Sequence, residues 1–143
     1  MQKRIFYKQN INKDYIISLL RDALNADEGV VFAYLYGSFI EADNFFCDID
    51  IAVYSKSREN RHALSVQIKE HLADMFSMRE LADFAADDFD VRIINEAAYD
   101  FVINIIDKGL LIVSKDEEIR TSYIEHICTE YRLNQIVLDE ALR

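Results

Sequence analysis

Two strand-length runs lie unusually close together in the sequence. Residues 30–36 are apolar or aromatic throughout, and residues 47–54 alternate between apolar and polar side chains. Only the segment 37–46 separates them. A parallel connection needs a crossover of about a dozen residues or more, usually a helix. The two runs therefore predict neighbouring antiparallel strands of one sheet.

The rest of the chain alternates between helical and strand patterns. Asn12 is placed to cap the first helix, and Gly109 follows the third. The predicted helices span residues 13–25, 58–79, 97–107 and 116–140, the further strands span 89–95 and 110–113, and residues 1–11 form an arm or a short strand. This order predicts an α/β (α+β) fold, with one mixed β-sheet flanked by helices.

The composition favours one folded domain. The 143 residues are 51% hydrophobic, with no proline and three glycines. A chain of about 150 residues buries enough surface to form its own core. We therefore expect a single domain over residues 1–143. Cys47 and Cys128 form no CxxC pair and are expected to be core thiols. Without a signal peptide or a membrane-length apolar run, the expected location is cytoplasmic, with no membrane contact.

Acidic residues outnumber basic ones by 26 to 16, which gives a formal net charge of −10. Such a chain repels phosphate backbones, so no broad nucleic-acid binding is expected. The acidity would suit a basic protein partner, although a merely soluble surface accounts for it equally well.

The acidic pair Asp48 and Asp50 is the first chemical feature of the sequence. Residues two apart on a strand point to the same face, about 6.5–7 Å from each other. Two like charges so placed need neutralising. Hard divalent cations do this, and Mg²⁺ typically binds one or two carboxylates together with substrate phosphate oxygens. The pair therefore predicts a metal site.

The Gly37-Ser38 turn precedes this pair and suits a phosphate. Glycine lets the backbone approach a ligand closely, and the N–H groups that follow can face phosphate oxygens. Ser38 adds a hydroxyl donor. We therefore predict that Gly37 and Ser38 bind the phosphates of a nucleotide.

Gly37-Ser38, nine residues and then Asp48-x-Asp50 resembles the signature of the DNA polymerase β-like nucleotidyltransferases, and the short length resembles their minimal (MNT) branch. In that family a third carboxylate lies on a later strand, and the matching position is Asp90. The resemblance implies that Asp48, Asp50 and Asp90 are catalytic and bind two Mg²⁺ ions (Mn²⁺ being possible), with ATP as the substrate.

The resemblance also implies an acceptor. Stand-alone MNT proteins, the MntA-type adenylyltransferase antitoxins among them, are paired with a small helical HEPN ribonuclease toxin. They transfer AMP from ATP to a toxin tyrosine and so block RNA cleavage. Two alternatives stay open: an MNT antitoxin with weak or absent catalysis that neutralises its toxin by binding, and a transferase for a small-molecule or RNA acceptor. The first alternative follows from residues 39–47, which contain no base.

Several residues also have a purely structural interpretation. Asp90 could pair with Arg92, in which case Asp87 or Asp88 would be the substitute metal ligand. Basic side chains that could reach a triphosphate are Arg92, Lys56 and Arg58. Tyr123 and Tyr131, on the predicted last helix, could face a partner, but a place in the core is favoured.

Overall fold

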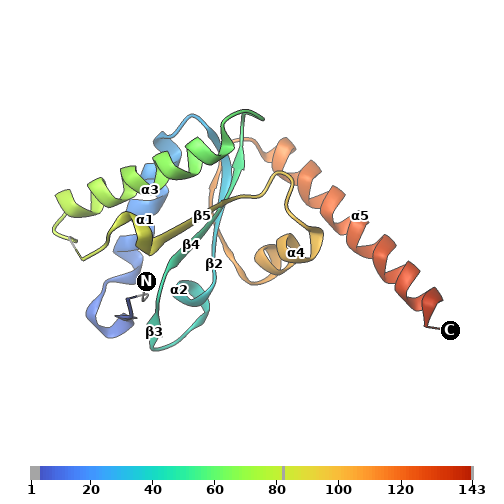
Figure 1. Cartoon of the computed structure of the whole chain (residues 1–143), viewed down its shortest axis with the longest axis horizontal. Helices are drawn as coiled ribbons and strands as arrows, with labels where there is room; N and C mark the ends of the chain where they lie inside the picture. Colours follow the sequence, from blue (N-terminus) through green and yellow to red (C-terminus); the bar gives the residue numbers. More distant parts are fainter. Residues whose placement is uncertain (1–3, 82, 143) are drawn as a thin grey trace.

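The computed structural model describes residues 4–81 and 83–142 of the chain (Figure 1). Strands and helices alternate along most of it. The strands are β1 Phe6–Tyr7, β2 Val30–Tyr36, β3 Phe45–Phe46, β4 Ile49–Ser55, β5 Phe89–Ile93 and β6 Leu110–Ser114. The helices are α1 Lys13–Ala26, α2 Ser38–Glu41, α3 Arg61–Met78, α4 Tyr99–Lys108 and α5 Glu117–Ala141, with 3₁₀ turns at Lys8–Asn10 and Ala86–Asp88.

The main sheet is mixed and has the strand order β5-β4-β2-β6. Strand β2 runs antiparallel to both β4 and β6, whereas β4 and β5 are parallel. The parallel pair is connected through α3, which supplies the long crossover that parallel strands need. The predicted mixed sheet, and the predicted antiparallel pair within it, are confirmed.

Helices cover both faces of this sheet. One hydrophobic cluster joins α1 and α3 to Ile49, Ile51 and Val53 of β4. The other joins α4 and α5 to Ala52 and Tyr54, which point the opposite way. The predicted alternation is therefore confirmed within β4, but the strand begins at Ile49 rather than at residue 47, so the predicted place of Asp48 on it is wrong. The face that carries Asp50 is also largely buried, at Ala52 above all.

The N-terminal segment forms a short strand, which was one of its two predicted forms. Strand β1 pairs with β3 in a separate two-stranded sheet. The ring of Phe6 stacks on Phe46 and on Phe84, with centroids 5.2 and 4.5 Å apart. Neither β3 nor the four-residue α2 was predicted, because elements this short have no periodicity to detect.

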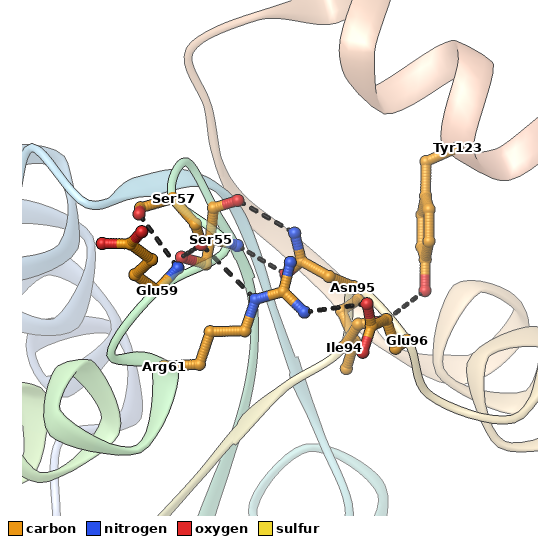
Figure 2. A network of polar contacts seen from close by, with 8 residues as sticks. All are labelled: Ser55, Ser57, Glu59, Arg61, Ile94, Asn95, Glu96 and Tyr123. Atoms are coloured by element: carbon orange, nitrogen blue, oxygen red, sulfur yellow. Dashed lines mark hydrogen bonds and ion pairs between the residues drawn. The ribbon is translucent and has the colours of Figure 1, made fainter.

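Several element ends differ from the predictions for local reasons. Helix α3 begins at Arg61 rather than at residue 58, because Asn60 has a left-handed backbone with φ of 56°. Strand β5 ends at Ile93 rather than 95. The Asn95 side chain leaves the ladder, accepting from the Ser55 N–H at 2.8 Å and donating to the Ser55 carbonyl at 2.9 Å. Figure 2 shows these contacts at the end of the sheet, beside Tyr123.

The helix caps largely follow the predictions. The Tyr15 N–H donates to the Asn12 side chain at 3.1 Å, which confirms Asn12 as the cap of α1. Gly109 caps α4, but with φ of −82° rather than a left-handed backbone. A Cβ there would lie 2.5 Å from the Ile105 carbonyl oxygen and 2.8 Å from that of Leu35. Glycine is needed at this position because two backbones approach it closely.

Two predictions about burial are wrong. Tyr123 is buried as expected, but Tyr131 is 39% exposed, because α5 extends beyond the helix that covers its first half. Cys47 and Cys128 are half-buried free thiols rather than core thiols. Within the described residues, no helix combines the length and the apolarity needed to cross a membrane.

Candidate functional site

Three side chains form a row across the sheet. Asp50 of β4 is the register partner of Asp90 on the parallel strand β5. Asp50 is also the register partner of Tyr36 on the antiparallel strand β2. Register partners on adjacent strands share a face, with the strands about 4.7–4.9 Å apart. The two aspartates predicted from different parts of the chain are therefore brought side by side, on the face that α4 and α5 cover.

Gly37 lies directly against the Asp50 carboxylate. A Cβ built on Gly37 would collide with Oδ2 of Asp50. The glycine has φ of 77° and ψ of −161°, a region that only glycine adopts readily. Ser38, which is half-buried, follows as the first residue of α2. The turn and the acidic strand thus meet at one end of the sheet, as predicted.

Tyr36 is the third residue of the row, and its pKa is affected by the two aspartates beside it. Burial of the phenol raises the pKa of Tyr36 well above its usual value, and the charges of Asp50 and Asp90 raise it further. Arg92 acts in the opposite direction. The phenol is therefore neutral at physiological pH. The sequence predicted no role for Tyr36, because its position opposite Asp50 depends on the strand register.

Arg92 is the basic residue of this site. Its Nε lies 3.6 Å from Oδ2 of Asp90, so the predicted alternative pairing is present. The guanidinium also lies 5.4 Å from the ring centroid of Phe101 on α4. That ring meets Tyr36 edge-on at 5.7 Å. Arg92 thus connects the acidic row to α4 and offers the site a positive charge.

The position of Asp48 differs from that of the other two aspartates. It precedes β4, which begins at Ile49, and is half-buried. Because Asp48 lies outside the strand, the alternation of β4 does not fix the direction of its side chain. Within the described residues, no group of three or more histidines, cysteines or acids is arranged to hold a metal ion. Asp50 and Asp90 do supply the two carboxylates that Mg²⁺ commonly takes alongside substrate phosphates.

The substitute acidic ligands do not join this row. Asp88 is buried and forms an ion pair with Arg4. It also accepts from the Ala85 N–H at 2.8 Å, so it holds the segment before β5 in place. Asp87 is exposed.

Two of the proposed triphosphate-binding bases lie at the wrong end of the sheet. Lys56 and Arg58 follow the last residue of β4, whereas Asp50 is near its start. Five residues of strand span about 16 Å. Both line a separate cavity of about 370 Å³ with Asn95 and Glu96.

Two lysines from the N-terminal part of the chain contact the segment 39–47, which has no basic residue of its own. Lys8 donates to the Ala42 carbonyl, and Nζ of Lys13 lies 3.5 Å from the Ile40 carbonyl. Burial lowers the pKa of Lys8, and the charge of Lys13 lowers it further. Their place beside α2 could not be read from the sequence, because it depends on the pairing of β1 with β3.

The geometry defines a class of protein: an α+β domain of the nucleotidyltransferase type, in which a glycine turn faces acids on neighbouring strands. The profile described as "Polymerase beta, Nucleotidyltransferase" matches residues 18–118, and the chain belongs to this family. The match includes Gly37, Ser38 and the three aspartates. Members of the family typically use divalent metal ions and nucleoside triphosphates. No match was found among curated protein sequences.

Solved structures of toxin–antitoxin complexes share the fold. The complex of tri-AMPylated Shewanella oneidensis HEPN toxin with MNT antitoxin matches with a TM-score of 0.54 and 20% identity, covering 94% of this chain and 99% of that chain. A toxin–antitoxin structure with AMP-PNP matches with a TM-score of 0.58 and 20% identity, over 93% and 100%. The MntA-HepT complex matches with a TM-score of 0.54 and 18% identity, over 92% and 97%. At these identities the likeness establishes the fold.

Proposed function

We propose that this protein is an MNT-type antitoxin that transfers AMP from ATP to a tyrosine of a helical HEPN ribonuclease toxin. The observation that carries the proposal is that Asp50 and Asp90 lie opposite each other on neighbouring strands, with Gly37 against the Asp50 carboxylate. Such an arrangement can hold a triphosphate and cations together at one strand end. Adenylylation takes place in the cytoplasm in this proposal.

The proposed roles follow the positions of the side chains. Asp48, Asp50 and Asp90 hold two Mg²⁺ ions, which when bound neutralise the triphosphate and favour formation of an oxygen nucleophile. Mn²⁺ can replace them. Gly37 and Ser38 bind the β- and γ-phosphates through backbone N–H groups and the serine hydroxyl.

The chemical step transfers one AMP group. The tyrosine oxygen forms a bond to the α-phosphorus, and the bond from that phosphorus to the pyrophosphate oxygen breaks. Asp90 accepts the tyrosine proton, since it lies at the edge of the acidic row and is partly exposed. Pyrophosphate leaves with the two electrons of the broken bond.

The relatives support the choice of acceptor. One solved relative holds a HEPN toxin that carries three AMP groups, and another holds AMP-PNP. The net charge of −10 suits a basic partner that cuts RNA and disfavours direct binding of RNA.

The test uses the partner that the proposal requires, a small helical HEPN-type protein encoded beside this chain. Purified partner is incubated with this protein, ATP and Mg²⁺, and its intact mass is measured. We expect the mass to increase by one or more AMP groups. Asp48→Ala/Asp50→Ala should abolish the increase, while the control Asp87→Ala/Asp107→Ala, which removes two exposed acids, should preserve it. Undiminished transfer by the first double variant would end the proposal.

A second function, neutralisation by binding alone, has two observations in its favour. Residues 39–47 contain no base, and Arg92 is engaged with Asp90. An antitoxin of this kind would block RNA cleavage by the partner without leaving any AMP on it. A transfer assay with small-molecule and RNA acceptors tests the remaining alternative, which the acidic charge disfavours.

A further inference from the structure

The second half of α5 exposes an apolar surface that nothing in the described fold covers. Tyr123 and Ile127 in the first half are buried against the sheet and α4. Beyond Tyr131, whose ring makes an edge contact with Tyr99 of α4, α5 projects away from the body (Figure 1). Five aliphatic side chains there are each more than half exposed: Leu133, Ile136, Val137, Leu138 and Leu142.

Part of this apolar surface continues a groove along the first half of the same helix. A groove of about 1000 Å³ runs beside α5 and is lined by Ile119 and His126, among others. Seven residues are nearly two full helical turns, so Ile119, His126 and Leu133 lie on one side of α5. Val137 lies four residues further on the same side. The groove, Leu133 and Val137 thus form one elongated strip, which we call the α5 face.

We propose that the α5 face docks a helix of the acceptor protein, with an apolar stripe that contacts Leu133 and Val137 and with lysines or arginines along its edges. The inference rests on the proposed function for the identity of this partner as the acceptor. A helix seated in an apolar groove is a common recognition mode, with anchors at helical spacing.

The negative charge of α5 favours a basic helix as the bound partner. Helix α5 carries six acidic side chains and two arginines. Three of the acids, Glu117, Glu118 and Glu125, line the groove. Arg120 is already engaged, with its Nη2 2.6 Å from Oε2 of Glu117. A second copy of this chain would bring the same acids, and an additional net charge of −10, against the face. An anionic lipid surface would be repelled as well, whereas a basic helix is attracted.

The position of α5 also suits delivery of an acceptor. The helix begins just after β6, near the end of the sheet opposite Gly37, and slants back so that its C-terminal end lies level with α2 and β3 in Figure 1. Helix α4 lies between this end and the sheet. A partner bound along the α5 face therefore extends toward the same end of the molecule as the acidic row.

The experiment compares two matched variants of the full chain. Leu133→Asp/Val137→Asp places charges at the two exposed aliphatic residues of the α5 face. Val66→Asp introduces a charge at an exposed valine of α3 and serves as the control. The affinity of each for the proposed helical acceptor protein is measured by titration calorimetry at low and high salt. Sedimentation records the self-association of each chain, and AMP transfer is followed in the same mixtures.

We expect Leu133→Asp/Val137→Asp to weaken binding at least about a hundredfold, since a few apolar anchors carry most of the binding energy of an interface. Val66→Asp should bind like the unmodified chain, and high salt should weaken both complexes. Circular dichroism and the melting temperature show whether both variants fold.

Three outcomes would overturn the inference. One is wild-type affinity in a folded Leu133→Asp/Val137→Asp variant; persisting AMP transfer would then leave the proposed function standing. Another is the absence of binding by the unmodified chain. The last is a dimer that this double variant dissociates, because the occupant would then be a second copy. If binding requires the α5 face but no AMP is transferred, the result contradicts the proposed function and leaves the docking site standing.

Discussion

Gly37 has a backbone conformation, with φ of 77° and ψ of −161°, that other residues adopt only under strain. Gly37→Ala would also drive a methyl group into the Asp50 carboxylate. We expect a loss of roughly 1–3 kcal/mol in the free energy of unfolding from the backbone alone. ATP binding should weaken as well, because the carboxylate is displaced. Urea unfolding and nucleotide titration measure the two effects.

Gly29→Ala is the matched control for this substitution. Gly29 has no positive φ, and its added Cβ meets the ends of the Leu64 and Asp27 side chains at 3.0 and 3.2 Å. Those side-chain ends can move to make room. Residue 29 precedes β2 and Gly37 follows it, so the control lies at the opposite end of the strand from the site. Equal losses of ATP binding in both variants would show that Gly37 has no special role at the site.

Tyr36 and Tyr123 give the protein a pH dependence on the alkaline side. Burial is the main cause that raises the pKa of each phenol in the folded chain. In the unfolded chain a tyrosine ionises near pH 10. The unfolded state therefore releases these protons first, so stability is retained below about pH 10 and declines as the pH rises above it.

Absorbance titration at alkaline pH measures this behaviour. We expect a late phase of tyrosine ionisation that coincides with unfolding. Tyr36→Phe and Tyr123→Phe should each reduce its amplitude. A late phase of unchanged size in the double variant would mean that other phenols produce it.

Part of the site could be predicted at the level of single residues. Gly37, Ser38 and Asp50 were identified from residue type and spacing, and Asp90 from the family resemblance; the structure places Asp50 between Gly37 and Asp90. Tyr36 was missed because its place opposite Asp50 depends on register, which the long 37–48 connection leaves undetermined. The metal-binding roles of the aspartates stay predictions.

Helix α5 shows what periodicity can and cannot establish. Its extent was predicted to within a residue at each end, because apolar residues recur along its whole length. The same periodicity favoured a core position for Tyr131, yet this residue is exposed. Spacing shows which side of a helix is apolar, and only the packing of α4 decides how much of that side is covered.

The uneven coverage of α5 predicts uneven stability along it. Apart from its contact at Tyr131, the second half has no packing partner among the described elements, and isolated helical segments of this length are marginal in water. We expect backbone amides of residues 133–142 to exchange hydrogen on the order of a hundredfold faster than those of residues 123–128. Hydrogen exchange with mass spectrometry resolves the two halves. Uniform protection along α5 in the monomer would contradict the prediction.

The three aspartates of the site lie outside the hydrophobic core, although Tyr36 beside them packs against one cluster. One cluster lies on each face of the sheet, and neither includes Asp48, Asp50 or Asp90. The fold class followed from the sequence because the helices and strands alternate in a clear order. The single domain over residues 1–143 stays a prediction. The two-stranded β1-β3 sheet could not be foreseen, since it joins segments about forty residues apart through only two residue pairs.

Because the three aspartates lie outside both hydrophobic clusters, removing cations should leave the folded state intact. We expect EDTA to leave the melting temperature of the nucleotide-free protein unchanged. Adding Mn²⁺ and a non-hydrolysable ATP analogue at about 100 times their Kd should stabilise the fold by about 2.7 kcal/mol, or roughly 5–10 °C.

The variant Asp50→Asn/Asp90→Asn separates the effect of the two aspartates on the stability of the free protein from their effect on ligand binding. Two adjacent carboxylates repel each other in the absence of a cation, so replacing both with neutral amides should preserve or raise the melting temperature without ligand. The same change removes the charges that attract a cation, so the ligand-induced increase should disappear. Calorimetric melting curves with and without ligand give both quantities. If the ligand still raised the melting temperature of the variant by the full amount, the cations would bind elsewhere. If instead the variant melted at a higher temperature without ligand and was no longer stabilised by it, Asp50 and Asp90 would be acids that bind ligand at a cost to the stability of the fold.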